Sequence, residues 1–221
     1  MKKKWNSSGL YPILDYDYCL KKEIDIFQIL RIWLSCPDYV ECIQIRAKSL
    51  TEKKYTHLFN EIQTSFPDAL FIINDHWKLY RKFPAYGIHL GKEDYQSLTE
   101  SEKEEFADIK MIKGTSSHSV EDLKNLDGNL WTYTGFGPMF ATETKKSDYE
   151  TLGLRALLTA SEFSPVPLVP IGGITLSSFP EIYRAVKCRP ASVSLYSHIP
   201  SFRKIISFLK GQNTAIKSEI L

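Results

Sequence analysis

The sequence has few cysteines, almost no net charge and no apolar run long enough to cross a lipid bilayer. Its four cysteines lie far apart and form no C-x-x-C pair, which argues against a disulfide framework or a zinc site. A formal net charge of +2 is too small to indicate nucleic acid or an anionic membrane as the main partner. The basic residues 2–4 are followed by a tryptophan and a short polar segment, residues 5–9, and not by the apolar core of a signal peptide. We therefore expect a soluble, cytoplasmic protein, and the composition leaves a homo-oligomer open.

The 221 residues contain no linker rich in proline, glycine and serine, and their composition does not change abruptly along the chain. A chain of this length can bury one large core. We expect a single domain over residues 1–210. Residues 211–221 lack a strong pattern and are expected to form a C-terminal tail.

Short apolar runs alternate with segments of helical spacing or helix-forming composition. The predicted strands cover residues 10–14, 42–46, 70–73, 87–90, 109–113, 130–134, 167–171 and 192–196. The predicted helices cover residues 24–34, 51–64, 101–106, 119–125, 149–162, 176–186 and 200–210, and a helix after Asp75 is expected to be short. Such alternation favours a parallel sheet with right-handed crossovers, and eight units predict a single-domain α/β fold, the (β/α)₈ TIM barrel. A doubly wound open sheet is the alternative, but no G-x-G-x-x-G follows the first strand.

Three polar residues have the spacing of helix N-caps. Thr51 precedes a helical segment, Ser101 has Glu104 three residues later, and Ser119 is followed by an acidic residue at the same spacing. We expect helices to begin at these positions.

The second predicted strand carries polar side chains on one face only. Because side chains alternate along a strand, Gln44, Arg46 and Lys48 share one face, and Ile43 and Ile45 share the other. Cations that point into a barrel are tolerated only near its open mouth and only where an anion pairs with them, because burial of an unpaired charge costs much free energy. The alternative is an edge strand with one solvated face.

Several predicted strands end in residues suited to contacts with metal, phosphate or hydroxyl groups. These endings are Asn74–Asp75, the segment from Gly91 to Asp94, Gly114–Ser116, Gly172–Gly173 and Ser197. The C-terminal ends of the strands form the face on which such barrels place their active sites. The repetition therefore predicts one polar site at this face.

Residues 135–146 form a further candidate phosphate site. The apolar run that ends at Phe136 is followed by Gly137–Pro138, by the hydroxyls of Thr142 and Thr144, and by Lys145. Glycine allows close backbone approach, threonine donates hydrogen bonds and lysine supplies a compact positive charge, all of which suit a phosphate-bearing anion. The alternative is a turn followed by a solvated charged loop.

As a set, these residues resemble the thiamine phosphate synthase family and its relative, the thiazole tautomerase. The matching stretches occur in the family's order over nearly the whole chain. They are specific as a set, although no single stretch is specific alone. The matching stretches are residues 10–11, 44–48, 74–75, 87–91 with Asp94, 114–116, 135–138 with 142–145, 171–174 and Ser197.

The resemblance implies a barrel enzyme with magnesium as cofactor. The reaction joins 4-amino-5-hydroxymethyl-2-methylpyrimidine diphosphate to 4-methyl-5-(2-phosphoethyl)thiazole and yields thiamine phosphate and pyrophosphate. The implied ligands of the pyrimidine diphosphate are Gln44, Arg46, Lys48, Asn74, Ser116 and Lys145, and the implied magnesium ligands are Asp75 and Asp94. The implied thiazole phosphate side comprises Thr142, Glu143, Thr144, Gly173, Tyr196 and Ser197. Arg46, Lys48 and Lys145 would stabilise the departing pyrophosphate.

Some positions depart from the family pattern. Ala47, His76, Tyr86 and Tyr196 stand where the family commonly has other residue types. Ala47 should point away from the site by the alternation above. Tyr196 matters more, since a bulky ring at the end of the last strand is expected to narrow the thiazole phosphate pocket.

Two other functions stay open. A thiazole tautomerase has the same fold and uses a histidine after the fifth strand, a place that His118 could fill, although we favour a surface loop for this residue. Asp75 and Asp94 favour the synthase, because a tautomerase binds no diphosphate. The second alternative is a non-catalytic paralogue that binds a phosphate ligand.

Overall fold

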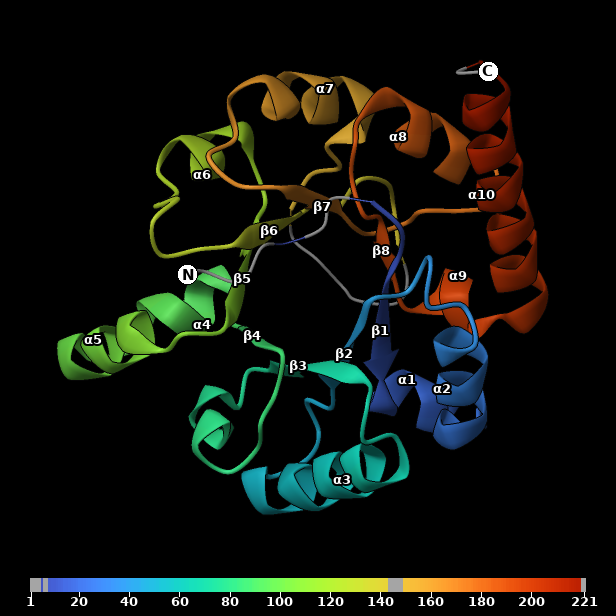
Figure 1. Cartoon of the computed structure of the whole chain (residues 1–221). Helices are drawn as coiled ribbons and strands as arrows, with labels where there is room; N and C mark the ends of the chain where they lie inside the picture. Colours follow the sequence, from blue (N-terminus) through green and yellow to red (C-terminus); the bar gives the residue numbers. More distant parts are fainter. Residues whose placement is uncertain (1–4, 6–7, 143–148, 220–221) are drawn as a thin grey trace.

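The computed structural model of the chain describes residue 5 and residues 8–142 and 149–219. Eight parallel strands form one sheet in the order β7-β6-β5-β4-β3-β2-β1-β8. A parallel bridge between Ile171 and Ala191 joins the two ends of this order, so the sheet closes into a barrel. Figure 1 looks along the barrel and shows the strands as an inner ring surrounded by helices. The predicted (β/α)₈ barrel is confirmed.

The elements follow the expected alternation of strands and helices. The strands are β1 Tyr11–Asp15, β2 Cys42–Arg46, β3 Leu70–Asn74, β4 Gly87–His89, β5 Ile112–Ser117, β6 Tyr133–Phe136, β7 Leu168–Pro170 and β8 Ala191–Ser192. The helices are α1 Tyr16–Lys21, α2 Ile26–Leu34, α3 Glu52–Ser65, α4 Lys92–Gln96, α5 Glu100–Asp108, α6 Val120–Lys124, α7 Gly153–Phe163, α8 Phe179–Ala185, α9 Ser194–Ser197 and α10 Ile199–Glu219, with the 3₁₀ helix η1 Trp77–Arg81. The last helix thus continues beyond residue 210. No helix in the described part of the chain is both long and apolar enough to span a bilayer.

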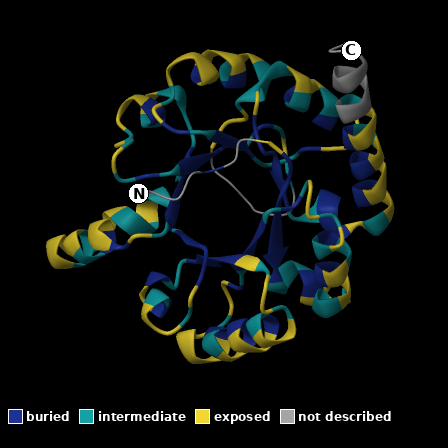
Figure 2. Cartoon of the chain, viewed as in Figure 1, coloured by how far each residue is buried: buried dark blue, intermediate teal, exposed yellow. Residues whose placement is uncertain are grey.

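Two apolar layers follow from the alternation along the strands. Ile43 and Ile45 of β2 pack outward in the large cluster between strands and helices. Tyr11, Ile72 and Tyr133 belong to a second cluster inside the barrel, where Trp5 joins them. Figure 2 shows the strands as the buried ring and the helices as exposed on their outer sides.

Strand β5 begins and ends later than predicted. It covers Ile112–Ser117 and not residues 109–113, so the polar run from Gly114 to Ser117 lies in the strand. A side chain at position 114 would overlap the ring of Tyr133 on the neighbouring strand, which explains a glycine within a strand. Ser116 is therefore held by the sheet and not by a loop. Strand β6 is displaced similarly and covers Tyr133–Phe136.

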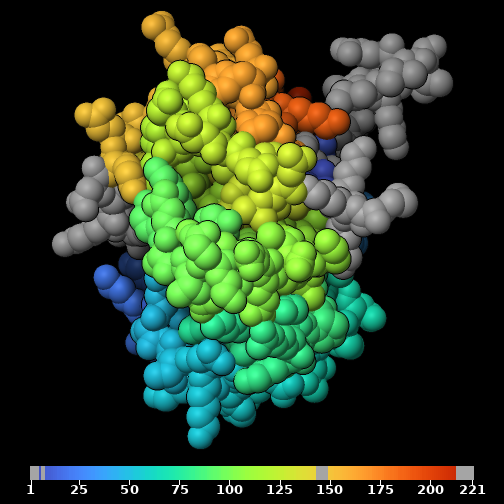
Figure 3. Space-filling model, turned by 90° about the vertical axis from the view of Figure 1, so that its left-hand side faces the viewer, coloured from blue at the N-terminus to red at the C-terminus, as the bar shows by residue number. Residues whose placement is uncertain are grey.

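Helix α5 begins at a different cap from the one predicted. The Glu102 backbone N–H donates to Thr99 Oγ1 at 3.3 Å, and the Thr99 backbone N–H donates to Glu102 Oε2 at 3.0 Å, so Thr99 forms the capping box. The prediction for Ser101 is wrong, because this exposed residue already lies inside the helix. Thr51 and Ser119 do cap α3 and α6. Figure 3 shows the flank of the barrel that α4 and α5 cover.

We expect Thr99→Ala to lower the free energy of unfolding by about 1 kcal/mol, because it removes the side-chain acceptor of the capping box. Ser101→Ala is the matched control and should change it by less than about 0.5 kcal/mol, as surface substitutions do. Urea unfolding followed by circular dichroism measures both values. Equal losses in the two variants would contradict this assignment of the cap.

Candidate active site

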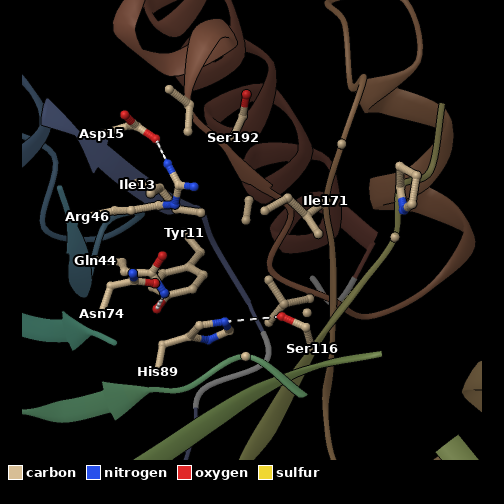
Figure 4. A pocket seen from close by; sticks show the side chains of 18 of the residues that line it. Tyr11, Ile13, Asp15, Gln44, Arg46, Asn74, His89, Ser116, Ile171 and Ser192 are labelled. Atoms are coloured by element: carbon tan, nitrogen blue, oxygen red, sulfur yellow. Dashed lines mark hydrogen bonds and ion pairs between the residues drawn. The ribbon is translucent and has the colours of Figure 1, made fainter. Parts of the chain in front are cut away.

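A cavity of about 330 Å³ lies at the C-terminal ends of the strands and reaches into the barrel. It brings together most of the residues that the sequence predicted for the site, from strands that are distant in the chain. Those that line it are Gln44, Arg46, Lys48, Asn74, Asp75, Asp94, Ser116, Thr142 and Gly173. Figure 4 shows how several of these side chains point into the same space. The inward face predicted for the second strand is confirmed.

Two carboxylates from different segments of the chain converge on the ammonium group of Lys48. Lys48 Nζ lies 3.2 Å from Asp75 Oδ2 and 3.8 Å from Asp94 Oδ2. Asp75 follows β3 directly and has a φ of 60°, a left-handed conformation that aspartate tolerates better than most residues. This turn of the chain places its carboxylate near Asp94 in α4.

Arg46 is held at the end of β2 by Asp15. A guanidinium N–H of Arg46 donates to Asp15 Oδ2, as Figure 4 shows. The other Asp15 oxygen, Oδ1, accepts the backbone N–H of Tyr18 at 2.9 Å and caps helix α1. Because Asp15 is buried, its pairing with Arg46 fixes the guanidinium beside the cavity.

The donor set suits an open magnesium site. Magnesium is usually bound by one or two carboxylates, completed by substrate phosphates and waters. Asp75 and Asp94 supply the carboxylates, and the ammonium of Lys48 already lies within reach of both. The part of the chain that the structure describes contains no cluster of three or more His, Cys, Asp and Glu side chains arranged as a metal cage. Asp75 and Asp94 fit a magnesium ion whose remaining ligands would be phosphate oxygens and waters.

Negative charge predominates among the described residues that line the cavity. The lining carboxylates are Asp15, Asp75, Glu93 and Asp94, and the lining arginine and lysine side chains are Arg46 and Lys48. The hydroxyl of Tyr149 donates to Glu93 Oε1 at 2.5 Å, which lowers the pKa of Glu93 and keeps it ionised.

Two glycines after β7 form the opposite wall. Gly172 and Gly173 have φ values of 94° and 65°, which residues with a side chain rarely adopt. A Cβ at position 173 would lie 2.5 Å from the carbonyl oxygens of Phe140 and Ala141. Glycine is thus required for the close packing of this loop against the segment that carries Thr142. Such backbone turns expose amide groups that suit a phosphate.

Five of the predicted residues do not line the cavity or cannot be placed. Glu143, Thr144 and Lys145 lie outside the described residues. Tyr196 and Ser197 lie in the short helix α9 and not at the end of a strand, and neither lines the cavity. The Tyr196 hydroxyl donates to Pro190 O at 2.8 Å, and its ring is buried in the outer core. The expectation that this ring narrows the pocket is therefore corrected.

Ser197 is buried in α9 and does not line the cavity. Its Oγ is buried, and no hydrogen-bond partner reaches it within the described residues. Its predicted role in binding the thiazole phosphate stays a prediction.

His118 lies in the cavity wall and not in a solvated surface loop. Its Nδ1 lies 2.8 Å from the carbonyl oxygen of Gly137, so Nδ1 carries the proton and donates. Its ring stacks on Tyr149 with the ring centroids 3.9 Å apart. These contacts fix the ring beside the site.

Several lining residues were assigned no ligand from the sequence, among them Tyr11, Asp15, His89, Glu93 and Tyr133. Tyr11, Ile13 and Asp15 occupy alternate positions of β1, so the period of two applied to this strand would have identified its inward face. His89 forms hydrogen bonds with Tyr133 and Ser116 within the cavity wall.

A family model described as thiamine monophosphate synthase matches residues 10–199. A thiamine-phosphate synthase of Methanococcus maripaludis is 31% identical over 180 residues, which cover 80% of this chain and 83% of the relative. One of Dictyoglomus turgidum is 32% identical over 209 residues, which cover 92% of this chain and 91% of the relative. The solved structure of a thiamine phosphate pyrophosphorylase from Pyrococcus furiosus superposes with a TM-score of 0.70 at 25% identity, covering 91% of this chain and 96% of that chain.

Proposed function

Because this chain belongs to the thiamine monophosphate synthase family, we propose that its cavity couples the pyrimidine diphosphate to the thiazole phosphate and releases pyrophosphate. The protein is then a transferase of thiamine biosynthesis that forms thiamine phosphate. The observation that carries this proposal is the convergence of Asp75 and Asp94 on Lys48 Nζ in the cavity that Arg46 also lines. That arrangement suits a diphosphate and its metal ion. A cytoplasmic location stays a prediction from the sequence.

The residues of β2, β3 and β5 hold the pyrimidine diphosphate in this proposal. Gln44, Asn74 and Ser116 line the inner part of the cavity and supply neutral hydrogen-bonding groups. Arg46 and Lys48 lie at the mouth and supply positive charge for the diphosphate. Lys145, which lies outside the described residues, would add a third cation.

The reaction needs charge stabilisation more than proton transfer. The bond between the pyrimidine methylene carbon and the diphosphate oxygen breaks, and its electron pair leaves with pyrophosphate. The lone pair of the thiazole nitrogen then forms the new carbon–nitrogen bond, and no proton has to move. Arg46 and Lys48 stabilise the charge that develops on the leaving group, because they are already oriented before the reaction.

Asp75 and Asp94 would hold the magnesium ion. When bound, the ion would neutralise charge on the leaving pyrophosphate. Both carboxylates lie beside Lys48 in the cavity, so an ion held there would neutralise charge at the same end of the cavity as this lysine.

The thiazole phosphate would bind at the opposite wall. Gly173 and Thr142 line this part of the cavity, and Glu143 and Thr144 continue the same segment outside the described residues. The left-handed backbone at Gly173 and the hydroxyl of Thr142 suit a phosphate group.

We expect the purified protein to form thiamine phosphate from both substrates and magnesium, and to lose this activity when EDTA removes the metal. Oxidation of the product to fluorescent thiochrome phosphate measures it. Binding of the thiazole ligand without any product would contradict the synthase and support the tautomerase or the non-catalytic paralogue. Aromatisation of the thiazole isomer in the same preparation would then identify the tautomerase, for which His118 is well placed.

A further inference from the structure

A line of hydrogen bonds crosses the interior of the barrel from Gln44 to Ser116. Gln44 Nε2 lies 3.1 Å from Tyr11 Oη, which lies 2.6 Å from Tyr133 Oη. Tyr133 Oη lies 3.1 Å from His89 Nδ1, and His89 Nε2 lies 3.3 Å from Ser116 Oγ. Figure 4 shows both ends of this line, with His89 directed at Ser116 and Gln44 beside Tyr11. The three residues in the middle have no role in the mechanism above.

Both tyrosines are buried and keep their protons. Tyr11 is 1% exposed and Tyr133 is fully buried, and Trp5 stacks on the Tyr133 ring with the ring centroids 4.0 Å apart. Burial raises the pKa of both phenols well above the ordinary value, so both are neutral hydrogen-bond donors. A buried donor without an acceptor costs free energy, so each hydroxyl proton needs a partner.

Because each hydroxyl proton needs an acceptor, donation along this line of hydrogen bonds can run in only one direction. The Gln44 amide nitrogen can only donate, so Tyr11 Oη accepts from it. The remaining hydrogen-bond partner of Tyr11 Oη among the described residues is Tyr133 Oη, so Tyr11 donates its proton there. Tyr133 must then donate to the ring of His89.

The direction of the line fixes the tautomer of His89. Since Nδ1 accepts from Tyr133, Nδ1 has no proton and Nε2 carries it. Nε2 then donates to Ser116 Oγ, which leaves the Ser116 hydroxyl proton available to a ligand in the cavity. The opposite direction would leave the Tyr11 proton buried without an acceptor and would consume the proton of Ser116.

We propose that Tyr133 is a positioning residue, which holds His89 as the Nε2–H tautomer and thereby makes Ser116 a hydrogen-bond donor to the anionic substrate. Tyr11 orients the Tyr133 hydroxyl and accepts from Gln44, so the line also connects the two substrate-binding residues at its ends. The assignment of the line stands on the geometry alone. Only the identity of the ligand that meets Ser116 rests on the proposed function.

The tautomer can be measured by NMR in the ligand-free protein. Histidine labelled with ¹⁵N, at a pH of about 8.5 where an ordinary imidazole is neutral, distinguishes a protonated Nδ1 from a protonated Nε2. His89→Gln identifies the signals of this residue. We expect the Nε2–H tautomer in the unmodified protein and in Tyr11→Phe, where Tyr133 still donates. We expect Tyr133→Phe to lose this preference, because Nδ1 then lacks its donor.

An Nδ1–H tautomer of His89 in the unmodified protein would overturn the proposal without any activity measurement. An unchanged His89 signal in Tyr133→Phe would overturn it as well. Because neither result depends on the substrate, a failure of the proposed function would not alter this test. Near-ultraviolet circular dichroism checks that the variants keep their packing.

Loss of the hydrogen bond from Ser116 to the anionic substrate should also change the kinetics. We expect both Tyr133→Phe and Ser116→Ala to raise KM for the pyrimidine diphosphate by about tenfold or more and to leave KM for the thiazole phosphate unchanged. The double variant should be no worse than either single variant, because both remove the same contact. Tyr86→Phe, on a tyrosine that donates to Glu41 outside this cavity, should change neither value. Additive effects in the double variant would contradict the proposal.

Discussion

Asp75→Asn is expected to reduce the formation of thiamine phosphate by roughly 100- to 1000-fold, as the loss of an oriented charge at a reacting group does. Asparagine keeps the shape of the side chain but removes the charge that faces Lys48 Nζ at 3.2 Å. The substitution would thus weaken magnesium binding, and it would remove one of the two carboxylate charges beside Lys48.

The same substitution should leave the fold intact. Asp75 has a φ of 60°, and asparagine adopts this left-handed conformation as readily as aspartate. The backbone N–H of residue 75 still donates to the carbonyl oxygen of His89, a contact of 3.0 Å that no side chain disturbs. We therefore expect no change in the melting temperature, whereas Asp75→Ala should lower it through backbone strain.

A magnesium titration of the thiochrome assay tests this expectation. Asp38→Asn is the matched control, because it makes the same change at an exposed position outside the cavity. Unchanged turnover of Asp75→Asn at limiting magnesium would show that this carboxylate does not bind the metal.

The barrel could be predicted because its strands carry a strong local pattern. In β2, polar and apolar residues alternate without exception from Ile43 to Arg46, and the structure places Gln44 and Arg46 in the cavity wall. A shift of one residue would bury the guanidinium in the outer core, so this register is well determined by the sequence. The same reasoning correctly placed the polar residues that follow β3.

The last strand could not be predicted so well. Val193, Leu195 and Tyr196 read as part of a strand, but the backbone N–H of Leu195 donates to Ser192 Oγ at 3.1 Å, and the chain enters a helical turn. Trp33 Nε1 donates to the carbonyl oxygen of Tyr196 at 3.0 Å, which fixes that turn against α2. A tertiary contact across 163 positions thus overrides the local pattern.

Long-range contacts also explain why the inner hydrogen bonds were missed. Tyr11 and Tyr133 are 122 residues apart in the sequence and meet only because β1 and β6 face each other across the barrel. Each residue alone is an ordinary aromatic of a buried strand. Their pairing depends on strand tilt and side-chain direction, which a periodic pattern does not contain.

Arg46→Met is expected to affect both activity and stability, because Arg46 has a partner on each side. Toward the cavity it would lose the contact with the departing pyrophosphate, which should lower turnover by roughly 100-fold. Toward the barrel wall it would leave Asp15 buried without its guanidinium. Removal of one partner of a buried pair costs about 3–5 kcal/mol, and since Arg46 is partly exposed we expect about 2–3 kcal/mol.

A second substitution separates the two effects. Asp15→Asn in the Arg46→Met background removes the unpaired charge and keeps an oxygen that can accept the Tyr18 N–H of helix α1. It should therefore recover most of the lost stability in urea unfolding but none of the lost turnover. Arg46→Lys should keep most of the stability and lose about tenfold in activity, because lysine lacks the planar fork that binds two oxygens. If the double variant recovered activity together with stability, the role of Arg46 would be to hold the barrel wall and not to stabilise the leaving group.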